Sequence, residues 1–469
     1  MRALLAAVPL AVVACAMLAR RSSRVSAALG LVALIPILIW GFPLNSTELV
    51  ALARDWAPVA TEVVLVVGGG IMFAEAGRQT GHQEVVSRWI TRALGTGILP
   101  VLAIVHGFTP LTESLTGYGI GAALAVPLLL GIGLSGRVAA TVGLLGLCAV
   151  PWGSLGPGTL IAAHLTGVSV DQLGVATAWF NGTVFLGAGV AAALLVCPAG
   201  TRLRGVAAGL ASGGTLWAAV WGANTLLGTA PAGALGGLCV LSAHLGLRAV
   251  RGQRIRISGA VLRALLPYAV VLGGVLTATS VVSMTGTAET LAAGVLTSPA
   301  LWLCAATATE LASRPRLLRA VWRAGSGTWV RVAPATVLFI LLGALMGASG
   351  MSEALAEQLA ALGTSFLFVL PFCAALIGLV TGSNSGANAL GAGAQADVAR
   401  ALGADATLAV GAHNAAGAAA MMASPARVEL ATRLARVPAE ASRVQRTLLL
   451  VLGGMVAPMA VLSLWTLSG

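Results

Sequence analysis

An uncharged polar stretch, Thr381 to Asn388, reads T-G-S-N-S-G-A-N and directly follows the apolar run 366–380. Its glycines, hydroxyls and amides favour a break in a membrane helix, and hydrocarbon does not tolerate the unpaired N–H and C=O groups that a break leaves. Such breaks occur where they line a cavity, and there the free N–H groups of a half-helix can hold an anion. A close contact between small residues of two helices is the structural alternative. The resulting candidates for anion binding are Thr381, Gly382, Ser383, Asn384, Ser385 and Asn388.

A second polar stretch, residues 108–121, contains a carboxylate and reads F-T-P-L-T-E-S-L-T-G-Y-G-I-G. A carboxylate at membrane depth is costly in its charged form, so Glu113 is a functional candidate and suits a proton carrier. A capping or otherwise hydrogen-bonded Glu beside Thr112 and Ser114 is the structural alternative. The neighbouring candidates for ligand binding are Thr112, Thr116, Gly117, Tyr118 and Gly119.

Three more polar residues within apolar runs are candidates. Asn414 lies near the start of a passage of small residues, 413–425, where its amide can either bind a ligand or join two helices. His413 can titrate near neutral pH, although a single His in a membrane helix is more often a hydrogen-bonded structural group. Glu62 is a second candidate for carrying a proton. No C-x-x-C pair indicates a metal site, and no HExxH, GxSxG or Walker A motif indicates a hydrolase or an ATPase.

The composition indicates what positions these residues. Of the 469 residues, 58% are hydrophobic and only 9% are charged, and apolar runs long enough to cross a bilayer recur from end to end. We therefore expect an all-α polytopic membrane protein with roughly 12–16 membrane passages. The net charge of +12 comes from Arg in short clusters between apolar runs, which indicates membrane topology and not nucleic-acid binding.

The Arg clusters also predict a path through the membrane. If they are cytoplasmic, both termini lie outside. A cleavable signal peptide is the alternative for residues 2–19, but the stronger charge follows this run, whereas a signal peptide carries it in front. The predicted division is 1–55 N-terminal spans, 56–200 first repeat unit, 201–328 connecting spans with basic loops, 329–446 second repeat unit and 447–469 C-terminal span.

Two parts of the chain resemble each other. Each reads as a span, an amphipathic segment, a span, a broken polar stretch, a span and a broken span. The matching segments are Leu94–Thr96 with Leu362–Thr364, Thr112–Gly117 with Thr381–Gly386, and Pro157 with Pro425. Chance similarity among helices rich in Ala and Gly is the alternative.

The charges predict that the two units point in opposite directions. The amphipathic segment of the first unit is flanked and crossed by Arg78, Arg88 and Arg92, whereas that of the second carries Glu353 and Glu357 and no Arg. By the positive-inside rule, the two segments then lie on opposite sides of the membrane. Inverted repeats with breaks at matching positions are typical of secondary transporters, whose binding site lies at the repeat interface.

At these motifs the chain resembles the lactate permease family, which includes glycolate permeases. The resemblance covers most of 60–200 and 330–450, and the middle of the chain matches only in hydropathy. It implies uptake of a small 2-hydroxy monocarboxylate with protons across the bacterial inner membrane. Our own interpretation of the intramembrane carboxylate is that Glu113 carries the proton. The segments similar to family motifs are 111–119, 127–134, 152–157, 381–390 and 413–425.

Three positions depart from the family motifs. Gly146-Leu147 stands where the family has Asn-Thr, His413 replaces a Gln, and Met421 replaces an Asn. These departures leave the identity of the organic anion open. A sodium-coupled or other organic-anion carrier is the alternative within the same class, and a membrane enzyme or a non-transporting membrane protein is the alternative from another class. We expect no cofactor besides a coupling ion, no nucleic-acid partner, and contact with the lipid bilayer; the sequence does not indicate an oligomeric state.

Overall fold

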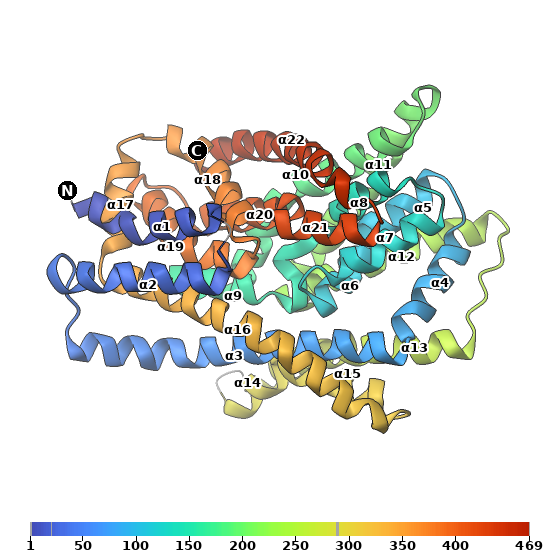
Figure 1. Ribbon diagram of the computed structural model, residues 1–469, viewed down its shortest axis with the longest axis horizontal. Coiled ribbons are helices and arrows are strands. Elements are labelled where there is room, and N and C mark those ends of the chain that lie inside the picture. Colours follow the sequence, from blue (N-terminus) through green and yellow to red (C-terminus); the bar gives the residue numbers. More distant parts are fainter. Residues whose placement is uncertain (1, 20, 288–289, 469) are drawn as a thin grey trace.

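The computed structural model describes residues 2–19, 21–287 and 290–468, and the regular elements in these ranges are helices (Figure 1). Two antiparallel helices open the chain and pack against helices of its second half. They are α1 (Arg2–Leu18) and α2 (Ser23–Trp40). Asn45 then caps the long α3 through a capping box with Glu48, which satisfies backbone donors at the start of that helix.

The first repeat unit contains α3 (Ser46–Thr80), α4 (His82–Leu94), α5 (Ile98–Leu102), the π-helical η1 (Ala103–Phe108), α6 (Thr109–Thr116), α7 (Ile120–Gly131), α8 (Gly136–Leu145), η2 (Gly146–Leu155), α9 (Pro157–Thr166) and α10 (Val170–Val196). The connecting region contains η3 (Ala199–Thr201), α11 (Arg202–Leu227), α12 (Thr229–Val250), α13 (Gly259–Thr285), α14 (Leu291–Thr297), α15 (Pro299–Leu311) and η4 (Pro315–Leu317). The second unit and the C-terminal span contain α16 (Leu318–Ala348), α17 (Met351–Ala360), α18 (Ser365–Thr381), α19 (Asn384–Ala401), α20 (Ala406–Ala420), η5 (Met421–Ala423), α21 (Pro425–Leu434), η6 (Pro438–Glu440) and α22 (Ala441–Leu467).

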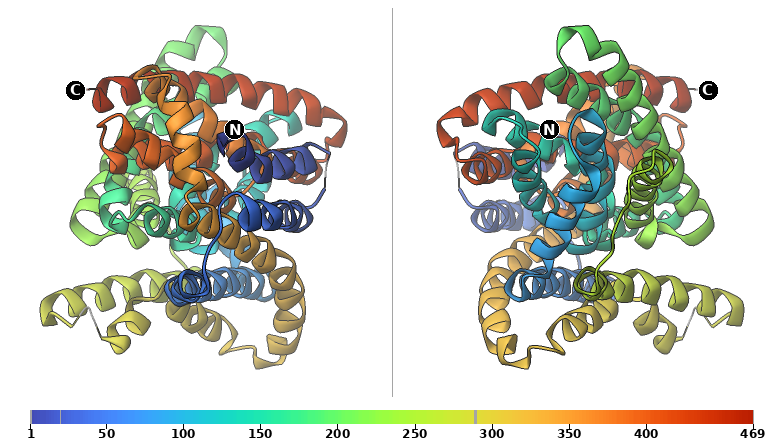
Figure 2. Two further views of the ribbon diagram at one scale, coloured as in Figure 1. Left: turned by 90° about the vertical axis from the view of Figure 1, so that its left-hand side faces the viewer. Right: turned by 90° about the vertical axis from the view of Figure 1, so that its right-hand side faces the viewer.

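The helices confirm an all-α polytopic membrane protein. Within the described ranges, ten helices are long and apolar enough to cross a bilayer, and the bent pair α14–α15, with an angle of 52°, brings the number to eleven. The shorter apolar helices α1, α7 and α18 accompany them. Figure 2 shows α13 to α15 on the same side of the molecule as α3 and away from α22.

The order of elements in the first unit recurs in the second. A long helix is followed by a short one, then by a span that ends at a left-handed glycine, a half-helix, a helix that tightens into a 3₁₀ turn, and a helix that begins at a proline. The corresponding elements are α3 and α16, α4 and α17, α6 and α18, α7 and α19, α8–η2 and α20–η5, and α9 and α21. The amphipathic segment that the sequence predicts around Arg88 and Arg92 is α4, residues 82–94, whose buried face includes Val86, Ile90 and Leu94.

The first helices of the two units run in opposite directions. Trp329 Nε1 of α16 donates to Val64 O of α3 at 3.0 Å, and Gly325 packs against Met72, so residue numbers fall along α16 as they rise along α3. The short helices α4 and α17 lie at opposite ends of the long axis in Figure 1. This arrangement is the one that an inverted repeat requires.

Two spans are longer than hydropathy predicts. Arg319 and Arg323 fall in the predicted connecting region 201–328 with its basic loops, but both lie in the first turns of α16, which begins at Leu318. Likewise α3 begins at Ser46, inside the predicted N-terminal region 1–55. The physical reason is that a helix can continue into water with charged residues, whereas hydropathy marks only its apolar part.

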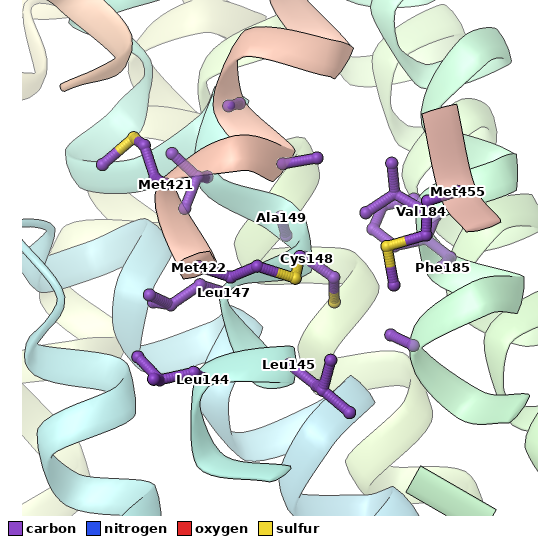
Figure 3. Close-up of a cluster of buried hydrophobic side chains, with 14 of the residues drawn as sticks. Leu144, Leu145, Leu147, Cys148, Ala149, Val184, Phe185, Met421, Met422 and Met455 are labelled. Atoms are coloured by element: carbon purple, nitrogen blue, oxygen red, sulfur yellow. The ribbon is translucent and has the colours of Figure 1, made fainter. Parts of the chain in front are cut away.

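A cluster of buried side chains joins the matching bends of the two units. Figure 3 shows residues of α8 and η2, including Leu147 and Cys148, in one cluster with Met421 and Met422 of η5. Phe185 of α10 and Met455 of α22 belong to the same cluster. The bends therefore pack directly against each other, which fixes the positions of α9 and α21, the helices that follow them.

Candidate functional site

The chain breaks at the predicted stretch of the second unit. Helix α18 ends at Thr381, Gly382 is left-handed with φ of 58°, and Ser383 is extended and caps α19. The Ser383 hydroxyl accepts a hydrogen bond from Gly386 N at 3.2 Å. Because α19 begins at Asn384, the amides of its first turns lie directly behind the break.

The break in the first unit is a turn of three left-handed residues. Gly117, Tyr118 and Gly119 have φ of 68°, 57° and 80°, and a tyrosine in this region is uncommon. The peptide between Tyr118 and Gly119 is held from both sides. Its N–H donates to Glu113 Oε1 at 2.8 Å, and its C=O accepts from Arg427 Nη1 of the second unit.

Each half-helix behind a first break packs against the helix of the opposite unit that begins at a proline, α9 or α21. Helix α19 lies along α9. At the N-terminal ends of the two helices, a Cβ at Gly158 would come within 2.6 Å of Asn384 Nδ2. At their C-terminal ends, Arg400 donates to Thr166 O. Helix α7 lies along α21, where Gly119 meets Arg427. Both pairs are parallel, so two helix N-termini meet at each junction.

We call the start of the α9/α19 contact, together with the side chains of α10 and α20 that bond to it, the amide junction. Its hydrogen-bonded side chains are all neutral: Thr159, Thr177, Asn384, Asn388 and Asn414. Asn414 is its centre. Its Oδ1 accepts from Asn384 Nδ2 at 3.1 Å and from Asn388 Nδ2 at 2.9 Å. Its Nδ2 donates to the hydroxyls of Thr159 at 2.9 Å and Thr177 at 3.1 Å. These bonds connect α19 and α20 of the second unit with α9 and α10 of the first.

We call the α7/α21 contact the carboxylate junction, and it comprises Glu113, Tyr118, Gly119, Gly121 and Arg427. The Glu113 carboxylate is 2% exposed and accepts from two backbone N–H groups at the start of α7, those of Gly119 at 2.8 Å and Gly121 at 3.0 Å. Hydrogen bonds of this kind stabilise an ionised carboxylate. Glu113 therefore caps α7, as the structural alternative from the sequence proposed.

Buried polar atoms without a partner lie at both breaks. Ser424 Oγ lies 3.6 Å from the place of a Cβ on Gly382, and Ser154 Oγ lies 3.4 Å from the corresponding place on Gly117. Neither hydroxyl has a hydrogen-bond partner within the described part of the chain, and neither does Asn388 Oδ1 in the amide junction. Buried polar atoms in proteins are nearly always satisfied, so these mark places for a ligand or water.

The amide junction has the electrostatics of an anion site. The N-termini of α9 and α19 carry partial positive charge, and the surrounding amides and hydroxyls supply hydrogen-bond donors. Its hydrogen-bonded network contains no carboxylate that would repel an anion.

The comparison with protein families agrees with this geometry. The family described as L-lactate permease matches residues 2–249 and 325–462. The chain belongs to the L-lactate permease family. This membership and the helical membrane fold point to a transporter and not to an enzyme. No individual curated protein matches the chain.

The family match covers both junctions but omits 250–324, which holds α13, α14 and α15. Two residues of the L-lactate permease motifs are replaced together here. Leu147 is 1% and Met421 is 5% exposed, and both lie in the apolar cluster of Figure 3.

Not all candidates from the sequence enter a junction as ligands. The hydroxyls of Thr112, Thr116 and Thr381 donate to carbonyls of their own helices. Ser385 is partly exposed on the first turn of α19. His413 is buried, with Nδ1 2.7 Å from Gln395 Oε1 and Nε2 3.2 Å from Ala387 O, so both ring nitrogens bond within the second unit.

Glu62 lies apart from both junctions. It lines a cavity of about 950 Å³ between α3, α9, α12 and the bent pair α14–α15, and its Oε1 accepts from Ser298 Oγ at 2.8 Å. The same cavity reaches Gly156 and Pro157, where α9 begins. The amide junction lies two residues further along α9, so this cavity approaches it from one side.

Sequence reasoning missed Thr159, Thr177 and Arg427. Two of them occupy equivalent places, because Thr159 follows Pro157 by two residues and Arg427 follows Pro425 by two. The repeat therefore contained a signal for both. Thr177 lies inside the long apolar helix α10 and carried no such signal.

Proposed function

We propose that this chain is a secondary active transporter that takes up lactate or a related small 2-hydroxy monocarboxylate together with protons. The observation that carries this proposal is the amide junction, a neutral set of donors at two helix N-termini in a member of the L-lactate permease family. A small carboxylate needs donors and partial positive charge, and the junction offers both.

The substrate binds at the amide junction through both of its functional groups. Its carboxylate accepts from Asn384, Asn388 and the free N–H groups at the start of α19, replacing amide contacts that the network now makes to itself. Its 2-hydroxyl donates to Asn388 Oδ1, the buried acceptor that has no partner in the described structure. The Gly117–Gly119 turn belongs to the other junction, where it leads into α7.

Transport uses the inverted repeat. In the two units, 56–200 and 329–446, each half-helix packs against a helix of the other unit. A movement of one unit relative to the other therefore changes both junctions together. Alternating access in transporters with inverted repeats arises from such movements around a fixed site.

Glu113 carries the coupled proton, with Glu62 and His413 as the alternative groups. A neutral Glu113 loses the charge that holds the N–H groups of Gly119 and Gly121, so protonation at this position acts directly on the break. The protein works in the bacterial inner membrane with both termini outside, and in Figure 1 the start of α1 and the end of α22 both lie in the left half of the view.

Uptake by purified protein in proteoliposomes tests the proposal. The substrates are lactate, glycolate, pyruvate, propionate and a dicarboxylate, each under an imposed pH gradient or an imposed sodium gradient. We expect accumulation of lactate or glycolate under the pH gradient. Accumulation driven only by a sodium gradient would show that the coupling ion is sodium and not the proton. Preference for the dicarboxylate would overturn the proposal that the substrate is a monocarboxylate.

A further inference from the structure

The two junctions differ in one respect that their common backbone does not explain: only the carboxylate junction contains an anion of its own. Glu113 places both carboxylate oxygens on N–H groups at the start of α7, those of Gly119 and Gly121. An anion bound at a half-helix N-terminus would occupy this same position. The protein's own side chain therefore stands where a ligand would bind.

Arg427 supplies the matching cation from the opposite unit. Its guanidinium donates to the C=O of Tyr118, and Glu113 accepts from the N–H of the same peptide. The peptide thus connects a cation on one side with an anion on the other, and hydrogen bonds in such a chain polarise one another. A guanidinium is also the side chain best suited to a carboxylate.

The amide junction lacks both charges at the corresponding places. Thr159 stands where the repeat places Arg427. Gly378, four residues before Gly382, stands where the first unit has Glu113, four residues before Gly117. The N-terminus of α19 is capped by the neutral hydroxyl of Ser383. One junction is therefore filled by a carboxylate, and its counterpart offers only neutral donors.

We propose that the carboxylate junction is a second site for a small monocarboxylate, which the Glu113 side chain occupies as a built-in ligand, with Arg427 as the positioning residue. The site is distinct from the transport site at the amide junction. Truncating Glu113 to Ala removes a methylene and a carboxylate, which together match the heavy atoms of acetate. The emptied junction then binds acetate from solution.

The test uses the full chain purified in detergent and follows thermal unfolding by the fluorescence of its 11 Trp residues. Glu113→Ala lowers the unfolding temperature, because two N–H groups and Arg427 lose their anion. Sodium acetate restores most of the loss in a saturable manner, whereas sodium chloride and acetamide do not. Acetamide has the shape of acetate without its charge, so it isolates the contribution of the carboxylate.

Two double variants separate this site from the transport site. The acetate response persists in Glu113→Ala/Asn384→Ala, in which the amide junction is impaired, and it is lost in Glu113→Ala/Arg427→Gln. A folded Glu113→Ala protein without an acetate response overturns the proposal. So does a response that equals that of the wild type or that disappears with Asn384→Ala. Because the measurement needs no transport, it is independent of the proposed function.

If Glu113→Ala does not fold, a double-mutant cycle tests the same pair. Glu113→Gln and Arg427→Gln each keep the size of the side chain and remove its charge. Interaction through the shared peptide predicts that the second substitution lowers the unfolding temperature less in the presence of the first. Additive shifts overturn the proposal.

Discussion

Replacing Asn384 with Ala removes one side-chain amide and its two hydrogen bonds from the amide junction and leaves the other bonds of the network in place. Asn384 is 8% exposed, donates to Asn414 Oδ1 at 3.1 Å and accepts from Asn388 Nδ2 at 3.3 Å. After truncation, Asn388 keeps its shorter bond of 2.9 Å to Asn414, and Asn414 keeps both Thr partners. The folded network therefore survives, and the truncation removes a donor that we propose for the substrate.

The size of the effect follows from that loss. Removing a partner of a buried polar group costs about 1–3 kcal/mol. At about 1.4 kcal/mol per factor of ten, this corresponds to a decrease in affinity of roughly ten- to a hundredfold. We expect KM for uptake to rise by this factor in proteoliposomes, with the amount of protein in the vesicles unchanged.

A second buried asparagine provides the control. Asn224 on α11 donates to Val220 O and accepts from Trp152 Nε1, and it belongs to neither junction. Asn224→Ala should lower the unfolding temperature and leave KM close to that of the wild type. An unchanged KM in Asn384→Ala, or the same increase in both variants, would refute a role of Asn384 in binding.

Four further outcomes are expected. Single cysteines that replace Glu84 and Gln358 in a Cys-free background should be labelled from opposite sides of the membrane, since both positions are exposed on the amphipathic helices. Labelling of both from the same side would contradict the inverted orientation of the two units. Glu113→Gln should abolish accumulation driven by a pH gradient while substrate exchange persists, and full accumulation would exclude Glu113 as the proton carrier. Glu62→Gln should leave accumulation intact in the same vesicles, because Glu62 bonds to the bent pair and not to a junction. Loss of accumulation in this variant would identify Glu62 as the proton carrier. Glu310→Gln should lower the unfolding temperature without changing KM, because this carboxylate is 1% exposed and connects α15 with the end of α3.

The sequence predicted the elements of the site better than their pairing. The break at Thr381–Asn388 was visible because uncharged polar residues interrupt an otherwise apolar passage, and the structure ends one helix and begins another there. The amphipathic helix 82–94 was visible through its helical period. Both signals are local, so a single sequence is sufficient to detect them.

The contacts between units could not be predicted in the same way. That α9 packs along α19, and α7 along α21, depends on how two distant parts of the chain fold together, and hydropathy contains no such information. Arg427 illustrates the limit. In the sequence it is one of several Arg in a basic segment that indicates a cytoplasmic side, but in the structure it reaches the Tyr118 carbonyl of the other unit.

Glu113 shows why an unusual residue is easier to find than to assign. The sequence identified it by the cost of a carboxylate at membrane depth and left a proton carrier and a cap as alternatives. The structure shows the capping bonds to Gly119 and Gly121. Capping and proton transfer do not exclude each other, since the same bonds would weaken on protonation, and the transport role of Glu113 stays a prediction.

The departures from the family motifs narrow the question of substrate choice. Leu147 and Met421 replace polar residues at the matching bends of the two units, and both now belong to the apolar cluster between them. Such a cluster offers no donor or acceptor to a substrate. If the amide junction is the transport site that we propose, discrimination among small organic anions depends on the amides and hydroxyls around Asn414. We then expect their donors to hold a carboxylate, and the unpartnered acceptor Asn388 Oδ1 to favour a ligand that brings a hydroxyl.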